Sequence, residues 1–78
     1  MAAENTRNIV AETEFTVPTM SSEASADAVL AALELVPGVR DATARMRKKR
    51  VSVRYEPGRV GEQQLKHALT QAGYPVVA

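Results

Sequence analysis

Along this 78-residue chain the spacing between apolar residues changes repeatedly between the alternation typical of strands and the spacing typical of helices. The order of these changes limits the folds that the chain can adopt. Residues 12–18, ETEFTVP, alternate between apolar and polar side chains, which predicts a half-buried strand that Pro18 ends. From Ser22 onward the apolar residues recur at helical spacing in an alanine-rich stretch, and the Pro-Gly pair at 37–38 predicts the end of this helix. Ser22 is a typical N-cap residue, and Ser25 falls in the first turn.

The second half of the chain repeats this succession of patterns. Residues 39–46 and 50–57 alternate, with one phase shift at Asp41, and the basic RKK between them predicts an antiparallel hairpin. Residues 61–73 have a second amphipathic helical pattern, and residues 74–78, YPVVA, predict a short last strand. Strand, helix, strand, strand, helix, strand is the order of a split βαβ sandwich. We therefore predict an α+β fold with a four-stranded antiparallel sheet and two helices on one face.

Composition narrows the class of protein. The length fits one small domain, for which we expect a flexible N-terminal tail over residues 1–11 and a folded unit over 12–78. The absence of cysteine excludes disulfides, thiolate metal sites and cysteine nucleophiles. A net charge of +1 excludes strong steering toward nucleic acid or anionic lipid. No apolar run approaches the roughly 20 residues of a membrane span, and no signal peptide is evident, so we expect a cytoplasmic protein.

No catalytic constellation emerges from the sequence. Ser22 and Ser25 have no base nearby in the predicted topology, and the carboxylates are scattered. His67, the only histidine, is predicted to be a surface residue. We therefore predict that the chain is not an enzyme.

The densest charge is the run RMRKKR, residues 45–50. It is compatible with docking of phosphate or an acidic partner, but a solvated hairpin tip is the favoured interpretation. An RNA-recognition module of the same topology would need aromatic rings on the exposed face of the sheet. Tyr55 belongs instead to the inward alternation, and the outward positions Ser52 and Arg54 carry no ring. We expect no nucleic-acid partner.

The loop over residues 17–25 precedes a helix N-terminus, where the helix dipole favours an anion or a thiolate. Taken alone, its side chains favour the simpler interpretation that Ser22 caps the helix. For Met20 a core position is favoured over a role as a weak thioether ligand. For Tyr74, packing in the core is favoured over shielding of the loop.

The segments EFTVPTMSSEASADAVLAALELVPGV, RVSVRYEP and LKHALTQAGYPV resemble the heavy-metal-associated domain of copper chaperones and copper-transporting P-type ATPases. That family has a strand, Met-x-Cys-x-x-Cys opening a helix, a Pro/Gly-Val turn, and Gly-Tyr before the last strand. The match covers residues 13–77 without a gap, and the residues at matching spacings are Met20, Leu33, Pro37-Gly38-Val39, Val51, Val53 and Gly73-Tyr74. The resemblance implies a ferredoxin-like βαββαβ fold.

The chain departs from this family at its metal ligands. Ser22 and Ser25 stand where the family has its two cysteines, whose thiolates bind soft Cu(I). A protonated hydroxyl is a hard and therefore poor ligand for the soft Cu(I) ion. We therefore expect metal binding to be deficient and no cofactor to be held. The resemblance implies that Met20 supports the loop and that Tyr74 shields it. Whether the serines are natural or engineered, and whether the parent metal is copper, silver, zinc or mercury, stays open.

The resemblance also implies a partner. Family members exchange Cu(I) with a related metal-binding domain or a copper-transporting ATPase that docks through the loop face. We expect a monomer without membrane contact, either stand-alone or a cytosolic module of a transporter. A metal-independent protein interaction module is the alternative. Candidate contacts with the partner are Arg59, Lys66, Arg47, Lys48 and Lys49.

Overall fold

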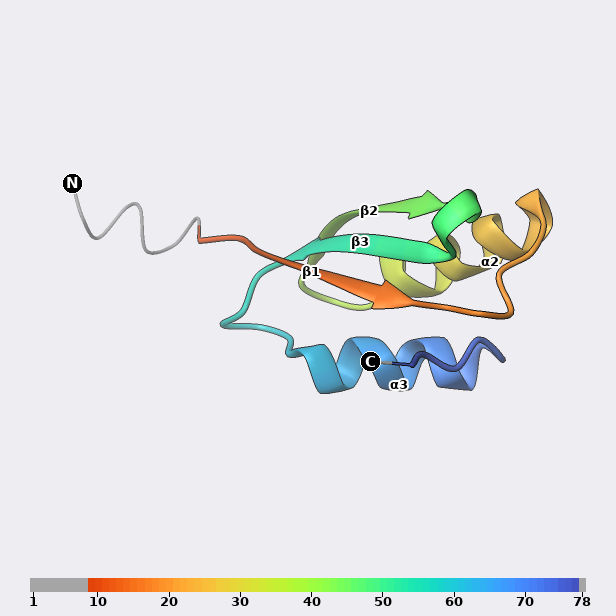
Figure 1. Cartoon of the computed structure of the whole chain (residues 1–78). Coiled ribbons are helices and arrows are strands. Elements are labelled where there is room, and N and C mark those ends of the chain that lie inside the picture. Colours follow the sequence, from red (N-terminus) through yellow and green to blue (C-terminus); the bar gives the residue numbers. More distant parts are fainter. Residues whose placement is uncertain (1–8, 78) are drawn as a thin grey trace.

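Strands and helices alternate in the structure, a computed structural model that describes residues 9–77, much as the apolar spacing predicts. Figure 1 shows the elements of the described part. In chain order they are β1 (Ala11–Thr16), α2 (Glu23–Glu34), β2 (Val39–Arg45), the short 3-10 helix η1 (Met46–Lys48), β3 (Arg50–Tyr55) and α3 (Glu62–Gln71). None of the described helices is long and apolar enough to cross a bilayer.

The sheet is antiparallel, with β3 in the centre between β1 and β2. Val51 of β3 lies between Phe15 of β1 and Ala44 of β2. The register of β2 shifts between Val39 and Asp41, which is the position where the sequence alternation changes phase. A bulge at this point returns the following side chains of β2 to the correct face.

The core lies between one face of the sheet and the two helices. Alternate side chains of β1 and β3 point into it, while Glu14 and Arg54 on the opposite face are exposed. Because α2 and α3 contribute buried residues to the same cluster, both helices cover this one face, as predicted (Figure 1). The buried residues are Phe15, Val17, Met20, Val29, Leu33, Val51, Val53, Tyr55, Val60, Leu65 and Leu69.

The prediction of a fourth strand over residues 74–78 is wrong for the described residues, since the C-terminal segment makes only one bridge, between Val77 and Thr16 of β1. The N–H of Tyr74 donates to the carbonyl of Leu69 at 2.8 Å and so caps α3. Pro75 has no N–H to donate. A ladder can therefore begin only near the end of the segment, and Val77 donates its N–H to the carbonyl of Thr16 at 3.0 Å.

Three predicted boundaries also need correction. Ala11, which we placed in the N-terminal tail, pairs with Tyr55 as the first residue of β1, while residues 1–8 of that tail lie outside the described part. The first helix ends at Glu34, before the Pro-Gly pair. Met46, predicted to continue β2, begins η1 with its side chain exposed.

Candidate functional site

The loop between β1 and α2 is anchored at two points before it reaches the helix. The N–H of Val17 donates to the carbonyl of Lys49 at 2.7 Å, which ties the loop to the end of the β2–β3 hairpin. The N–H of Met20 then donates to the carbonyl of Val17 at 3.1 Å and closes a turn. The Met20 side chain is completely buried and the next residue, Ser21, is exposed. The chain therefore passes from the core to the surface between these two residues.

Ser22 and Ser25 come together at the start of α2. Ser22 has an extended backbone and is the N-cap, and its Oγ accepts the N–H of Ser25 at 3.1 Å. The two Oγ atoms lie 2.9 Å apart and form a hydrogen bond in which either can donate. Ser22 is exposed and Ser25 is half-buried. The hydroxyl pair therefore stands at the solvent-facing N-terminus of a helix.

This donor set does not suit a soft metal ion. Both side chains are neutral hydroxyls, and the chain has no cysteine. The thioether of Met20 is enclosed in the core and cannot turn to the surface without vacating its position there. No group of three or more His, Asp or Glu residues in the described part is arranged to hold a metal ion. Oxygen donors without charge favour neither Cu(I) nor other thiophilic ions.

Tyr74, the other residue predicted to support the loop, is half-buried and packs against the core cluster. Its backbone N–H is engaged in capping α3. His67 is exposed on α3, and its Nε2 lies 3.3 Å from Nε2 of Gln71.

The predicted partner contacts fall on different parts of the molecule. Lys49 joins the loop directly through its carbonyl, and Arg47 and Lys48 are exposed in η1 at the same end of the sheet (Figure 1). Arg59 follows β3 at the opposite end and pairs with Glu56 at 3.7 Å. Lys66 is exposed on α3. One docking face at the loop can include the hairpin residues but not Arg59.

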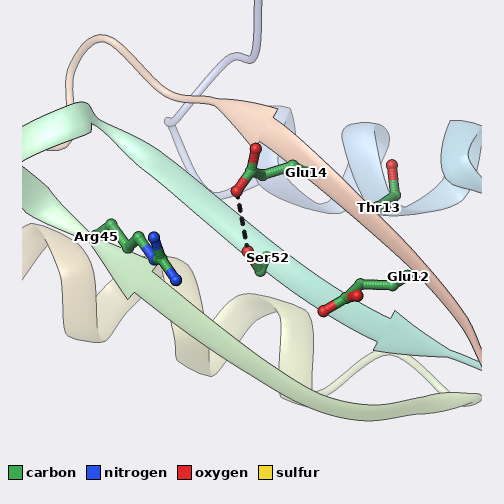
Figure 2. A pocket seen from close by; sticks show the side chains of 5 residues that line it. All are labelled: Glu12, Thr13, Glu14, Arg45 and Ser52. Carbon is green, nitrogen blue, oxygen red and sulfur yellow. Dashed lines mark hydrogen bonds between the residues drawn. The ribbon is translucent and has the colours of Figure 1, made fainter.

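The outer face of the sheet is polar. Figure 2 shows a shallow depression on it, lined by Glu12, Thr13, Glu14, Arg45 and Ser52, where Ser52 donates to Glu14 at 3.3 Å. The only aromatic residue of β3, Tyr55, is buried on the other face, in agreement with the predicted alternation.

Sequence reasoning missed a second depression, which lies between α2 and the end of β2. Its lining is Glu23, Ala26, Asp27, Leu30, Ala44 and Met46. The spacing of the four α2 residues in that set is a signal for one helix face. That spacing does not show what lies opposite the helix face, because the sequence pattern predicts that Met46 continues a strand.

Known structures share this architecture. The CopZ metallochaperone is 33% identical, with a TM-score of 0.83 over 86% of this chain and 100% of that chain. Oxidized MerP from Ralstonia metallidurans CH34 is 25% identical, with a TM-score of 0.85 over 88% of this chain and 96% of that chain. The N-terminal domain of a potential copper-translocating P-type ATPase from Bacillus subtilis, solved in the Cu(I)-loaded state, is 26% identical, with a TM-score of 0.82 over 87% and 85%.

No curated protein sequence matches the chain at a significant level. The sequence model of the heavy-metal-associated domain matches residues 14–75, which is most of the chain. Domains of this family are non-catalytic metal-binding modules, in agreement with the prediction that the chain is not an enzyme. By this match and by its likeness to CopZ, the chain belongs to the heavy-metal-associated domain family.

Proposed function

We propose that this chain is a metal-binding and transfer domain of the copper-chaperone or copper-ATPase type whose two ligand positions, 22 and 25, hold serine. In this form it binds Cu(I) weakly or not at all. The observation that supports the proposal is the position of the two hydroxyls, 2.9 Å apart at the solvent-facing start of α2. In the sequence resemblance, positions 22 and 25 correspond to the two cysteines of the Met-x-Cys-x-x-Cys pattern.

The difference between serine and cysteine at these positions is one of ligand chemistry. A thiol at a helix N-terminus loses its proton more readily because the dipole favours the anion. The resulting thiolate is soft and matches Cu(I). A hydroxyl at the same place stays protonated at neutral pH. Serine is also close to cysteine in size and caps the helix well, so the scaffold persists while metal affinity is lost.

The proposal extends to partner and location. Two solved relatives are a metallochaperone and the N-terminal domain of a potential copper-translocating ATPase. We therefore propose that the partner is a related metal-binding domain or such an ATPase, and that docking uses the end of the molecule that carries the loop and η1. A cytoplasmic location and a monomeric state in dilute solution accord with this role.

A Cu(I) competition titration tests the metal-site proposal. The chain as it stands and its Ser22→Cys/Ser25→Cys variant compete with a chromogenic Cu(I) chelator in the presence of reductant. The reductant is necessary because the short separation of the two Oγ atoms brings the introduced sulfurs within reach of a disulfide. We expect only the cysteine variant to withdraw Cu(I) from the chelator.

The matched control is Ser22→Ala/Ser25→Ala, which removes the hydroxyls and should behave like the serine chain. If the double cysteine variant binds Cu(I) no more tightly than the serine chain, positions 22 and 25 are not a thiolate metal site. If the alanine variant loses measurable Cu(I) affinity, the hydroxyls are ligands after all and the proposed deficiency is wrong.

A metal-independent interaction module is the second candidate function. The observation in its favour is that the loop is well ordered by its own contacts without cysteine or metal, since Ser22 caps α2 and Met20 is buried in the core. Adding an unlabelled copper-ATPase metal-binding domain to the ¹⁵N-labelled serine chain, without metal, separates the two functions. Chemical shift changes in the loop amides would favour the metal-independent interaction module. Unchanged spectra would favour a metal-transfer domain that docks only when Cu(I) is bound.

A further inference from the structure

A groove of about 320 Å³ runs between the first half of α2 and the end of β2. Its floor is apolar, with Ala26 and Leu30 from the helix and Ala44 from the strand. Met46 of η1 also lines the groove and keeps 36% of its surface exposed. A flexible thioether on the rim of an apolar groove is typical of surfaces that adapt to a partner.

The groove is acidic on its helix side and adjoins a basic segment, Arg47 and Lys48 of η1, which does not itself line it. On the helix side stand Glu23 and Asp27, and α2 as a whole contains acidic but no basic residues. On the other side Met46 is followed in η1 by Arg47 and Lys48. Within the described part of the chain, neither these two acidic residues nor these two basic residues take part in an ion pair, although all four are exposed.

The hairpin end accumulates positive charge at a cost. Arg45 and Arg50 are direct cross-strand partners in the β2–β3 register. Like charges placed opposite one another destabilise a sheet. Arg50 is relieved by Glu14, with 3.4 Å between Nη1 and Oε1, but Arg45 takes part in no ion pair of the described residues. Arg45 lines the depression on the outer face of the sheet, so this excess lies close to η1 but not in the groove beside α2.

An acidic helix side beside the basic segment of η1 gives this surface charges that can complement those of a second copy. A two-fold rotation about an axis through the groove brings the acidic side of one molecule onto the basic segment of the other, and the reverse contact forms at the same time. The apolar floors then face each other across the axis. This is the condition for an isologous interface.

We propose that the groove between α2 and the hairpin end binds a second copy of this chain, with η1 of each copy against Glu23 and Asp27 of the other. The contact is small and mostly charged, so it is a weak, transient dimer that forms at high protein concentration and weakens with salt. It requires no metal, and because the chain has no cysteine, no metal-thiolate bridge can mimic it. It therefore stands independently of the metal-site proposal.

A charge-exchange experiment tests this dimer. Amide chemical shifts of the ¹⁵N-labelled chain are recorded from micromolar to millimolar concentration at low and high salt. We expect saturable shifts centred on Ala26, Leu30, Ala44 and Met46 that disappear at high salt. The variants Glu23→Lys/Asp27→Lys and Arg47→Glu/Lys48→Glu should each lose self-association, and an equimolar mixture of the two should recover it, because the acidic sides then meet basic sides again.

A control with the same net charge separates a specific contact from general attraction. Arg59→Glu/Lys66→Glu lowers the formal net charge from +1 by four units, as Arg47→Glu/Lys48→Glu does, but both positions lie outside the groove. In the mixed pair one of the two contacts is basic against basic, so the ¹⁵N-labelled Glu23→Lys/Asp27→Lys variant should show no groove shifts with this control.

Absence of concentration-dependent shifts at millimolar protein would overturn the proposal. It would also be overturned by shifts that map elsewhere, or by equal recovery with the control variant. Shifts in the groove that arise only on addition of a related metal-binding domain would assign the surface to that partner instead.

Discussion

Gly38 combines two features that disfavour a side chain, a left-handed backbone and a close approach by neighbouring atoms. Replacement of Gly38, Gly73 and Gly58 by alanine, one at a time, separates their effects on stability. Gly38 has a φ of +100°, and a Cβ at this position would lie 2.9 Å from Cγ1 of Val60 and 3.1 Å from Cβ of Arg59. Gly73 has a similar φ of +91°, but nothing lies within 4 Å of its Cβ direction. Gly58 combines open space with a φ outside the left-handed region. Alanine therefore meets backbone strain and crowding at Gly38, backbone strain alone at Gly73, and neither at Gly58.

The expected losses in free energy of unfolding follow from this geometry. A left-handed backbone costs an L residue about 1–2 kcal/mol, which is the whole expected effect of Gly73→Ala. At Gly38 overpacking adds about 1–3 kcal/mol, because Val60 is buried and cannot swing aside. Gly38→Ala should therefore destabilise the domain by about 2–5 kcal/mol. Gly58→Ala should be neutral or stabilising by less than about 1 kcal/mol.

Urea unfolding followed by circular dichroism measures all three variants on one scale. Small domains have a total stability of about 5–15 kcal/mol, so the loss at Gly38 should be visible as a large fall in the urea midpoint. Equal losses for Gly38→Ala and Gly73→Ala would refute the idea that the close approach of Val60 matters. A loss at Gly58 as large as that at Gly73 would refute the role of φ.

Three further predictions concern the loop and the last segment. Ser22→Ala should lower the free energy of unfolding by about 1 kcal/mol through loss of the N-cap, while Ser25→Ala should change it by less than about 0.5 kcal/mol; equal losses in urea unfolding would contradict the cap. Met20→Ala should cost about 2–5 kcal/mol and the same change at exposed Met46 much less, in the same assay. In hydrogen exchange the Val77 amide should exchange far faster than the buried-strand amides of β3, since a single bridge holds it; comparable protection would indicate a full fourth strand.

The strands and helices were predictable wherever one local pattern decided them. The alternation in β1 and β3 assigned Phe15 and Tyr55 to the core, and both are buried. The sequence alternation changes phase at Asp41, and the register shift of β2 lies at the same point. Local patterns failed at Met46, whose side chain continues the alternation while its backbone turns into η1.

The last segment shows why boundaries were harder to predict. Val76 and Val77 have strand propensity, but pairing depends on backbone donors rather than on side chains. The N–H of Tyr74 donates to α3 and Pro75 has none, and among the described residues of this segment Val77 alone forms a bridge to β1. The commitment of Tyr74 depends on where α3 ends, which no pattern within residues 74–77 reveals.

By itself, the sequence determined the succession of strands and α-helices from β1 to α3, the sides of each that face the core, and the chemistry of the side chains at the loop, because periodicity and residue type are local properties. Only the tertiary structure decided that the two serine hydroxyls meet at 2.9 Å and that Met20 is enclosed. It also decided that Met46 at the hairpin end lies beside the acidic face of α2. The physical reason is that these relations depend on how the segments pack around a common core, and packing is set by distant residues acting together.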